Sequence, residues 1–267
     1  MYLHRHLPAI TRLIAALALI LLPLSARAEI SFSVSPIRVE LSGEPGGTHT
    51  DAMEVRNEGN EKVRIKVSMQ DWYLSEEGTP IFQKGGTQSH SCTGWMKINP
   101  VDFLLQAGEK KVVRYSVAIP SGIKDGGYWG AFVFETVPQV VPGQKTKAVA
   151  IKGNIGSIVY IVVGKPVPAG DILAMTYDDR KGRKILTRIK NTGTVHFRIK
   201  GNIKITDTAG KTVQTTDLSD VPILADSSRT IPVTLDDKLP AGGYTAVATV
   251  DIGAKAVLSG EFSFVVK

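Results

Sequence analysis

The sequence predicts an all-β protein built from two β-sandwiches. Short segments alternate apolar and polar residues with a period of two, as in residues 63–69, VRIKVSM, which is typical of a half-buried strand. Turn-forming residues are frequent, with 26 glycines and 14 prolines in 267 residues. After residue 28, no stretch repeats apolar residues at the three- and four-residue spacing of a capped helix.

Residues 1–28 have the features of a cleaved signal peptide. Two arginines precede an apolar run over residues 13–24, and the small-x-small pattern Ala26-Arg27-Ala28 ends the segment. A membrane anchor is the alternative, but it needs about 20 apolar residues, and this run is shorter and broken by Pro23. We therefore expect an exported mature chain of 239 residues that does not insert stably into a membrane.

Charge and cysteine content limit what the exported chain can do. The signal segment contains three arginines and no acidic residue, so its removal lowers the formal charge from +7 to +4. A weakly basic exported protein is not expected to bind nucleic acid. Cys92 is the only cysteine, so no intramolecular disulfide can form and the fold must be stabilised by packing. Because Cys92 and the nearby His90 follow Gly85-Gly86, we expect a loop here rather than a nucleophile or metal site.

The first block of strands begins directly after the signal segment. In residues 37–41, Ile37, Val39 and Leu41 are expected on one face of a strand, with Arg38 and Glu40 on the other. Turn sequences separate this strand from its neighbours. The predicted strands of this block cover residues 31–34, 37–41, 63–69, 112–119 and 128–137.

A second block repeats the same pattern after a proline-rich hinge. An apolar strand over residues 148–163 leads to Gly164-Lys165-Pro166-Val167-Pro168, a stiff linker. We therefore predict a signal peptide at 1–28, a first immunoglobulin-like domain at 29–164 and a second at 165–267. A single large barrel is the alternative, which the hinge disfavours. The predicted strands of the second block cover residues 185–189, 197–205, 230–235, 244–252 and 261–266.

The sequence contains no catalytic motif. There is no G-x-S-x-G, H-E-x-x-H or P-loop pattern, and only three histidines remain in the mature chain. Acidic pairs lie beside glycine or lysine in expected turns, where they are solvated. A secreted hydrolase would require a clustered acid or nucleophile, so we expect no enzyme activity, no cofactor and no metal.

The order of motifs in the first block resembles a known family. Residues 99–114 have the form N-P-x-x-F-x-L-x-x-G-x-x-x-x-V-R, and an aromatic strand ending Val137-Pro138 follows. Pro36-Ile37-Arg38-Val39 lies ahead of them, and residues 227–232 and 251–253 follow in the second block. This arrangement resembles the periplasmic pilus-assembly chaperones of the chaperone-usher type, over nearly the whole mature chain. The resemblance implies two immunoglobulin-like domains that meet at an angle.

The resemblance also implies how such a protein would work. In that family the chaperone lends a strand to a pilus subunit whose own sandwich lacks one, through backbone pairing and alternate side chains. Here the lending strand would be residues 147–155, with Val149, Ile151 and Ile155 on the donor face. Each buried side chain would contribute about 1.5 to 3 kcal/mol. An ordinary interior strand of the first sandwich is the alternative for this segment.

The family anchors the terminal carboxylate of its subunit between the domains with an arginine and a lysine. Arg38 falls on the arginine position, although a solvated edge-strand charge is the alternative for it. The lysine position lies near Gly156 and Ser157, neither of which is basic. Lys152 is the nearest cation, about four residues earlier, so the resemblance assigns carboxylate anchoring to Arg38 and Lys152.

The leading hypothesis from the sequence is a periplasmic chaperone for pilus or surface-fibre subunits. Its partners would be such subunits and an outer-membrane usher, to which the subunits are delivered. The alternative is a secreted, envelope-associated adhesive or polysaccharide-binding module that uses its loops or tryptophans. We expect Trp72, Trp95 and Trp129 to lie in the core or in a cleft wall, which does not favour that alternative.

Overall fold

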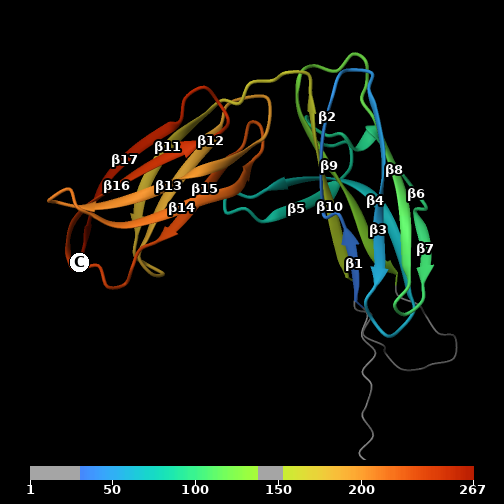
Figure 1. The fold of residues 1–267 in the computed structure, drawn as a ribbon, viewed down its shortest axis with the longest axis horizontal. Helices are drawn as coiled ribbons and strands as arrows, with labels where there is room; N and C mark the ends of the chain where they lie inside the picture. Colours follow the sequence, from blue (N-terminus) through green and yellow to red (C-terminus); the bar gives the residue numbers. More distant parts are fainter. Residues whose placement is uncertain (1–30, 138–152) are drawn as a thin grey trace, which may run out of the picture.

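The computed structural model describes residues 31–137 and 153–267, which form two β-sandwiches (Figure 1). The predicted all-β class is confirmed, since the described residues contain strands and a single 3₁₀ turn at Thr93–Trp95. Within these ranges, no helix has the length and apolar character needed to span a bilayer. The predicted signal peptide at 1–28 lies outside the described residues.

The first sandwich pairs a four-stranded sheet, in the order β1-β3-β8-β6, with a sheet in the order β2-β10-β9-β4-β5, in which β7 also pairs with β4. Neighbouring strands are antiparallel except β2 and β10, which run parallel. The strands are β1 (Phe32–Ser35), β2 (Arg38–Gly43), β3 (Thr48–Asn57), β4 (Val63–Leu74), β5 (Pro80–Lys84), β6 (Met96–Asn99), β7 (Asp102–Leu105), β8 (Lys110–Ala118), β9 (Gly126–Val137) and β10 (Asn154–Val163).

The second sandwich pairs a three-stranded sheet, β11-β12-β15, with a four-stranded sheet, β14-β13-β16-β17. Three strands facing four is the arrangement of a constant-type immunoglobulin domain. The strands are β11 (Gly170–Asp178), β12 (Lys184–Asn191), β13 (Phe197–Asp207), β14 (Thr212–Ile223), β15 (Ser228–Thr234), β16 (Gly242–Asp251) and β17 (Leu258–Val266).

Each sandwich has its own apolar core, built from the alternating residues of its strands. Val63, Ile65 and Val67 of β4 are buried in the first core, as their period-two spacing predicts. Ile185 and Ile189 of β12 are buried in the second core. The two cores share no residue, so each sandwich excludes water on its own.

The prediction for Ile37 is wrong. Its side chain is 64% exposed, whereas Val39 is buried in the first core. Strand β2 begins only at Arg38, so Ile37 precedes the strand and does not follow its alternation. Ile37 instead contributes to the wall of a cleft between the two sandwiches.

A third apolar cluster joins the sandwiches. Trp72, Trp129 and Tyr160 of the first sandwich pack with Leu224 and Ala225 of the second. The Trp72 indole N–H donates to the carbonyl of Gly130, and the Trp129 indole N–H donates to the carbonyl of Trp72, at 3.1 and 3.0 Å. Since both indole N–H groups are bonded inside the first sandwich, their rings are held as a rigid surface for the second.

The hairpin of β4 and β5 makes a second connection between the two sandwiches (Figure 1). At its tip, the carbonyl of Glu76 accepts a hydrogen bond from the backbone N–H of Thr230, at 2.8 Å. The Glu76 carboxylate also pairs with Arg188 on β12, at 2.6 Å. The hairpin therefore reaches across from the first sandwich to β12 and β15 of the second.

Candidate functional site

A cleft of about 700 Å³ lies where the two sandwiches meet. The chain between β1 and β2, the β4–β5 hairpin and β10 form its walls on the first sandwich, and β13 and β14 close it from the second. The walls are apolar, but two guanidinium groups enter the cleft. Its lining residues are Ser35, Pro36, Ile37, Arg38, Trp72, Leu74, Gly78, Pro80, Ile158, Tyr160, Arg198 and Pro222.

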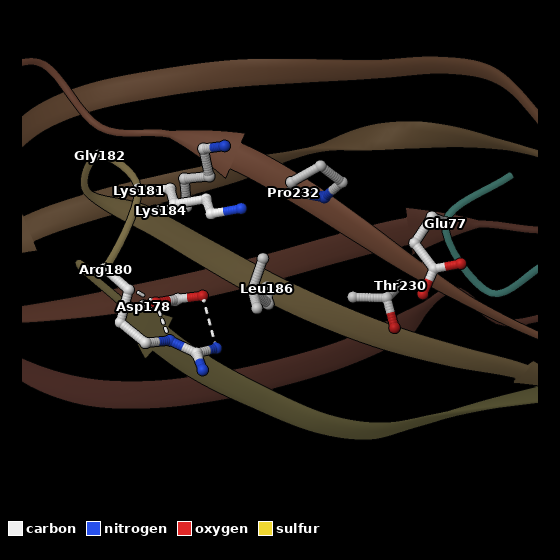
Figure 2. Close-up of a pocket in the computed structure, with 9 residues that line it drawn as sticks. All are labelled: Glu77, Asp178, Arg180, Lys181, Gly182, Lys184, Leu186, Thr230 and Pro232. Carbon is white, nitrogen blue, oxygen red and sulfur yellow. Dashed lines mark hydrogen bonds and ion pairs between the residues drawn. The ribbon is translucent and has the colours of Figure 1, made fainter.

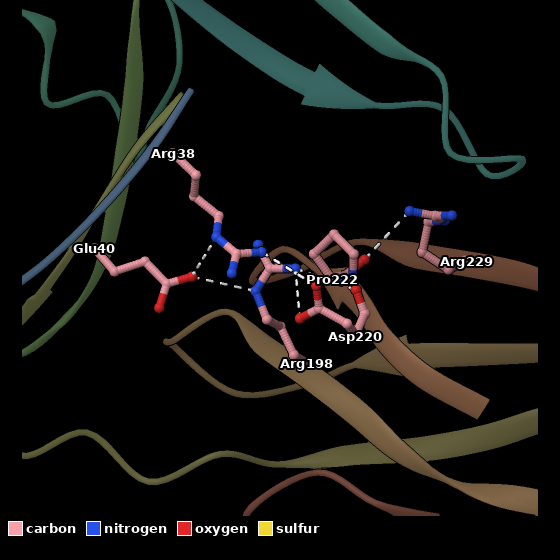
Figure 3. A network of polar contacts seen from close by, with 6 residues as sticks. All are labelled: Arg38, Glu40, Arg198, Asp220, Pro222 and Arg229. Atoms are coloured by element: carbon pink, nitrogen blue, oxygen red, sulfur yellow. Dashed lines mark hydrogen bonds and ion pairs between the residues drawn. The ribbon is translucent and has the colours of Figure 1, made fainter. Parts of the chain in front are cut away.

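The two guanidinium groups belong to Arg38 on β2 and Arg198 on β13, so each sandwich supplies one. Two carboxylates lie between them and bridge the sandwiches (Figure 3). Glu40 Oε1 lies 3.2 Å from Arg38 Nε and 3.3 Å from Arg198 Nε. Asp220 Oδ2 lies 3.1 Å from Arg38 Nη1, and its Oδ1 lies 3.1 Å from Arg198 Nη1. Each carboxylate therefore contacts both arginines.

A β-bulge directs Asp220 toward this cluster. Val221 pairs with Ile199 and Ser219 pairs with Lys200, which leaves Asp220 without a cross-strand partner. Its φ of 55° is in the left-handed region, which aspartate tolerates better than most residues. The hydrogen bond from Arg38, together with the charge of Arg198, lowers the pKa of Asp220, so its carboxylate is ionised.

Arg198 is fixed on a second side by an aromatic ring. Its guanidinium carbon lies 5.4 Å from the centre of the Tyr160 ring, and its side chain is only 19% exposed. Burial raises the pKa of Tyr160 to about 12, so the phenol stays neutral beside the two arginines. Arg38 is more accessible, at 46%. The cleft thus presents one fixed and one accessible guanidinium.

A third arginine, Arg229, lies behind the hairpin tip. Its Nη1 donates to the carbonyl of Pro222 at 3.2 Å, and its Nε is buried without a hydrogen-bond partner among the described residues (Figure 3). Burial lowers its pKa, although a guanidinium remains charged at any physiological pH. Arg229 therefore adds positive potential to the cleft from the second sandwich.

Strand β10 (Asn154–Val163) runs along the first sandwich to the cleft, where Ile158 and Tyr160 line the wall. Its pairing with β2 begins at Ile158, opposite Arg38. Residues 154–157 pair with β9 on one side, and no strand in the described ranges pairs with them on the other. The start of β10 is therefore an open sheet edge that leads to Arg38.

Gly156 and Ser157 of β10 have little room for a longer side chain. A Cβ atom at Gly156 would lie 2.6 Å from the ring of Phe82 on β5, so a longer side chain there requires that ring to move. The next residue, Ser157, is buried, and its hydroxyl donates to the carbonyl of Pro36 at 2.8 Å. The cation that lies beside Arg38 is Arg198 of the second sandwich.

Of the site residues predicted from the sequence, Arg38 lies in the cleft and Ile155 is partly buried against the first core. Val149, Ile151 and Lys152 lie outside the described residues. The cluster of Arg198, Glu40 and Asp220 was not predicted from the sequence. Arg198 and Asp220 are 160 and 182 residues from Arg38 along the chain, and nothing local in the sequence marks their contact.

In the described residues, the three tryptophans and Cys92 contribute to packing and do not form a binding site. Trp72 and Trp129 are buried, and Trp95 packs partly buried on the first core, so they form no exposed aromatic platform. Cys92 is fully buried, and burial raises the pKa of its thiol. His90 stacks on Trp129 with ring centres 4.7 Å apart. Across the described ranges, no group of three or more potential metal ligands gathers.

A second groove, of about 660 Å³, lies on the outer face of β11, β12 and β15 (Figure 2). Asp178 forms two hydrogen bonds with the Arg180 guanidinium, and these bonds lower the pKa of Asp178 to about 2. None of the residues lining this groove has a buried polar side-chain atom without a partner among the described residues. In the interdomain cleft, by contrast, Arg198 Nε is buried without a hydrogen-bond partner among the described residues, so the cleft is the better candidate for a binding site.

No family model matches this chain, and no curated protein matches it. Solved structures do match at low identity. The class 5 fimbriae chaperone CfaA is 14% identical, over 86% of this chain and 98% of that chain, with a TM-score of 0.47. A chain of the CsuC–CsuE chaperone–tip adhesion subunit complex from Acinetobacter baumannii is 12% identical, over 87% and 97%, with a TM-score of 0.45. A chain of the Salmonella enterica SafA pilin–SafB chaperone complex is 14% identical, over 90% and 99%, with a TM-score of 0.44.

Proposed function

We propose that this protein is a periplasmic chaperone, without enzyme activity, that binds incomplete fibre subunits by strand addition. Residues 147–155 would supply the strand, and Arg38 would receive the carboxylate that ends the bound chain. The subunits would then be delivered to an outer-membrane usher. The observation that carries this proposal is the open edge of β10, which leads directly to Arg38.

The parallel pairing of β2 with β10 supports a particular direction for the bound strand. Arg38 faces Ile158, and the pairing continues to Gly43 opposite Val163. A chain that pairs with β10 upstream of Ile158 and continues the line of β2 would also run parallel. Its C-terminus would then point toward Arg38. The guanidinium N–H groups of Arg38 and Arg198 favour a carboxylate at that point over an amino terminus, since they can only donate hydrogen bonds.

Strand addition would use both backbone and side chains. The N–H and C=O groups of residues 154–156 that do not point toward β9 can form ladder bonds with an added strand. Of the apolar side chains predicted on one face, Val149 and Ile151 would fill the groove of the incomplete subunit, whereas Ile155 already packs partly against the core of the first sandwich. Burying each of the first two would contribute about 1.5 to 3 kcal/mol.

Co-expression with a fibre subunit encoded beside this gene tests the proposal. We expect a 1:1 complex by size-exclusion chromatography with light scattering. The Ile151→Asp variant should lose the complex, because a charge would enter the subunit groove. The matched control is Ala150→Asp, which carries the same charge on the opposite face of the strand. No complex with the wild-type protein, or equal loss in both variants, would contradict the proposal.

A further inference from the structure

The ion cluster in the cleft has two carboxylates with different tasks. Glu40 uses one oxygen to contact Nε of both Arg38 and Arg198, at 3.2 and 3.3 Å. Asp220 uses its two oxygens separately, one on Nη1 of each arginine. Glu40 thus pairs with both arginines by charge alone, whereas Asp220 accepts a hydrogen bond from Nη1 of each (Figure 3).

The contacts of Asp220 are those that an incoming carboxylate would make. Two guanidinium groups, each donating to one oxygen, form a charge-assisted site for a single carboxylate. Asp220 fills this site from an unpaired bulge position, and its side chain is 63% exposed. It can therefore leave the arginines for water without breaking the β13–β14 ladder.

The arginines would keep their positions after Asp220 leaves. The Glu40 carboxylate would still form ion pairs with both arginines, and Arg198 Nη1 also donates to the backbone carbonyl of Asp220, at 3.1 Å. The Tyr160 ring supports Arg198 from a further side. A ligand carboxylate would thus find two oriented donors and would replace one exposed carboxylate with another.

We propose that Asp220 is an internal substitute for the ligand: its carboxylate occupies the Arg38–Arg198 pair in the free protein and is displaced by the C-terminal carboxylate of a bound chain. The inference rests on the proposed function for the identity of that chain. It assigns Arg198, from the second sandwich, as the partner of Arg38 in carboxylate binding. In the free protein, Asp220 would also compete with any other carboxylate for the two arginines, and so lower the affinity of the cleft for it.

An NMR titration of the arginine Nε–Hε signals tests the inference with small probes. The probes are an acetylated dipeptide with a free C-terminal carboxylate and the same dipeptide with a C-terminal amide. The Arg38→Lys and Arg198→Lys variants assign the two signals. The test variant is Asp220→Asn, because asparagine also tolerates the left-handed backbone. The matched control is Asp217→Asn on the same strand, whose carboxylate forms no ion pair with the described residues.

We expect Asp220→Asn to bind the carboxylate probe about three- to tenfold more tightly than the wild-type protein, with both arginine signals shifting. Asp217→Asn should bind the probe as the wild-type protein does, and the amide probe should shift neither signal. Unchanged or weaker binding by Asp220→Asn overturns the inference, as does the absence of carboxylate binding in both proteins.

The outcome separates this inference from the proposed function. If Asp220→Asn binds the carboxylate probe more tightly but no fibre subunit forms a complex, the internal substitute is supported and the chaperone proposal fails. If subunits are captured but Asp220→Asn does not change probe affinity, the chaperone proposal stands and the inference fails.

Discussion

The imidazole of His196 lies against the phenol ring of Tyr160, with ring centres 4.4 Å apart, and the two residues belong to different sandwiches. Gly127 of β9 makes this contact possible, since a Cβ atom there would lie 3.0 Å from the backbone nitrogen of His196. The Gly127 N–H donates to the carbonyl of Thr194 at 2.7 Å. The second sandwich therefore rests directly on the backbone of the first beside the cleft.

The burial of His196 predicts a loss of stability in mild acid. Burial lowers its pKa from 6.5 to about 4; the charge of Glu40 acts to raise the pKa, and the charge of Arg198 acts to lower it further. The unfolded chain therefore takes up a proton first as the pH falls below 6.5. The free energy of unfolding should decrease by about 3 kcal/mol between pH 6.5 and pH 4 from this residue. Chemical denaturation across this range measures the decrease.

The His196→Gln variant is the comparison for this pH dependence. It has no group that titrates at this position, so its free energy of unfolding should fall less over the same range. The slope with pH is the informative quantity, because the substitution also changes packing against Tyr160. An unchanged slope in His196→Gln would assign the acid sensitivity to another group.

Asp71 fixes the loop that carries His90 and Cys92. Its carboxylate is buried and accepts hydrogen bonds from the backbone N–H groups of Thr87 and Gln88, at 2.6 and 2.9 Å. Burial acts to raise the pKa of Asp71, but its hydrogen bonds, that from Ser91 foremost, lower it overall. Asp71→Asn should decrease the free energy of unfolding by about 2 kcal/mol. Asp51→Asn, an exposed carboxylate on β3, should change it by less than about 0.5 kcal/mol.

Asp71 should also make the free energy of unfolding depend on pH, in a different pH range from His196. Since its pKa is lowered on folding, its contribution is present above the ordinary aspartate pKa and is lost as the pH falls through the folded value. Urea denaturation at pH 7 and pH 3 measures this contribution. A stability difference between Asp71→Asn and the wild-type protein that is as large at pH 3 as at pH 7 would exclude the ionised carboxylate as its source.

Most of the fold could be predicted from the sequence, because a strand with one buried face alternates apolar and polar residues within its own short segment. Residues 63–69 and 112–119 follow this rule. Strand β14 (Thr212–Ile223) was not predicted, because most of its residues are polar and partly or fully exposed. Ile37 was misplaced for a different reason: its side chain meets a cleft that exists only when both sandwiches are present.

The candidate site was less predictable than the fold. Arg38 was found through a family motif, whereas Arg198 and Asp220 have no local signal. Their contact depends on the angle between the sandwiches and on a bulge in β14. The sequence shows only that Arg198 lies between two apolar residues, Phe197 and Ile199, which are buried. Any exposed residue of a strand with one buried face has such neighbours.

Arg38 should be important for binding and unimportant for stability. Its ion pairs with Glu40 and Asp220 are about half exposed to solvent, and such pairs contribute little. Arg38→Ala should therefore shift the thermal midpoint by less than about 2 °C while abolishing subunit capture. Differential scanning fluorimetry beside the co-expression assay measures both. A large decrease in the thermal midpoint would show that Arg38 is structural.

The thiol of Cys92 should be inert in the folded protein. It is fully buried, its Sγ lies 3.6 Å from Met96 Sδ, and burial raises its pKa. A thiol-specific reagent should react with it only after denaturation, because the reactive thiolate is neither accessible nor formed. Rapid labelling at neutral pH without denaturant would contradict the buried position.

The tip of the β4–β5 hairpin offers a test of the contact between the sandwiches. Gly78 has a φ of 95°, and a Cβ atom there would lie 2.0 Å from Arg229 Nη2. Gly86, beyond the other end of β5, has a φ of 79° and no atom within 4 Å of the same position. Alanine at either site should lower the free energy of unfolding by about 1 kcal/mol, because its backbone would have to adopt the left-handed conformation. Only Gly78→Ala must also displace Arg229.

Gly78→Ala should therefore destabilise the protein more than Gly86→Ala does. The displaced Arg229 would lose its hydrogen bond to the carbonyl of Pro222, and the hairpin tip would separate from β15. The difference between the two variants in the free energy of unfolding isolates this contact, because the backbone cost is common to both. Small-angle scattering should show a wider range of interdomain angles for Gly78→Ala alone. Equal effects of the two substitutions on stability and scattering would mean that the hairpin does not fix the arrangement of the sandwiches.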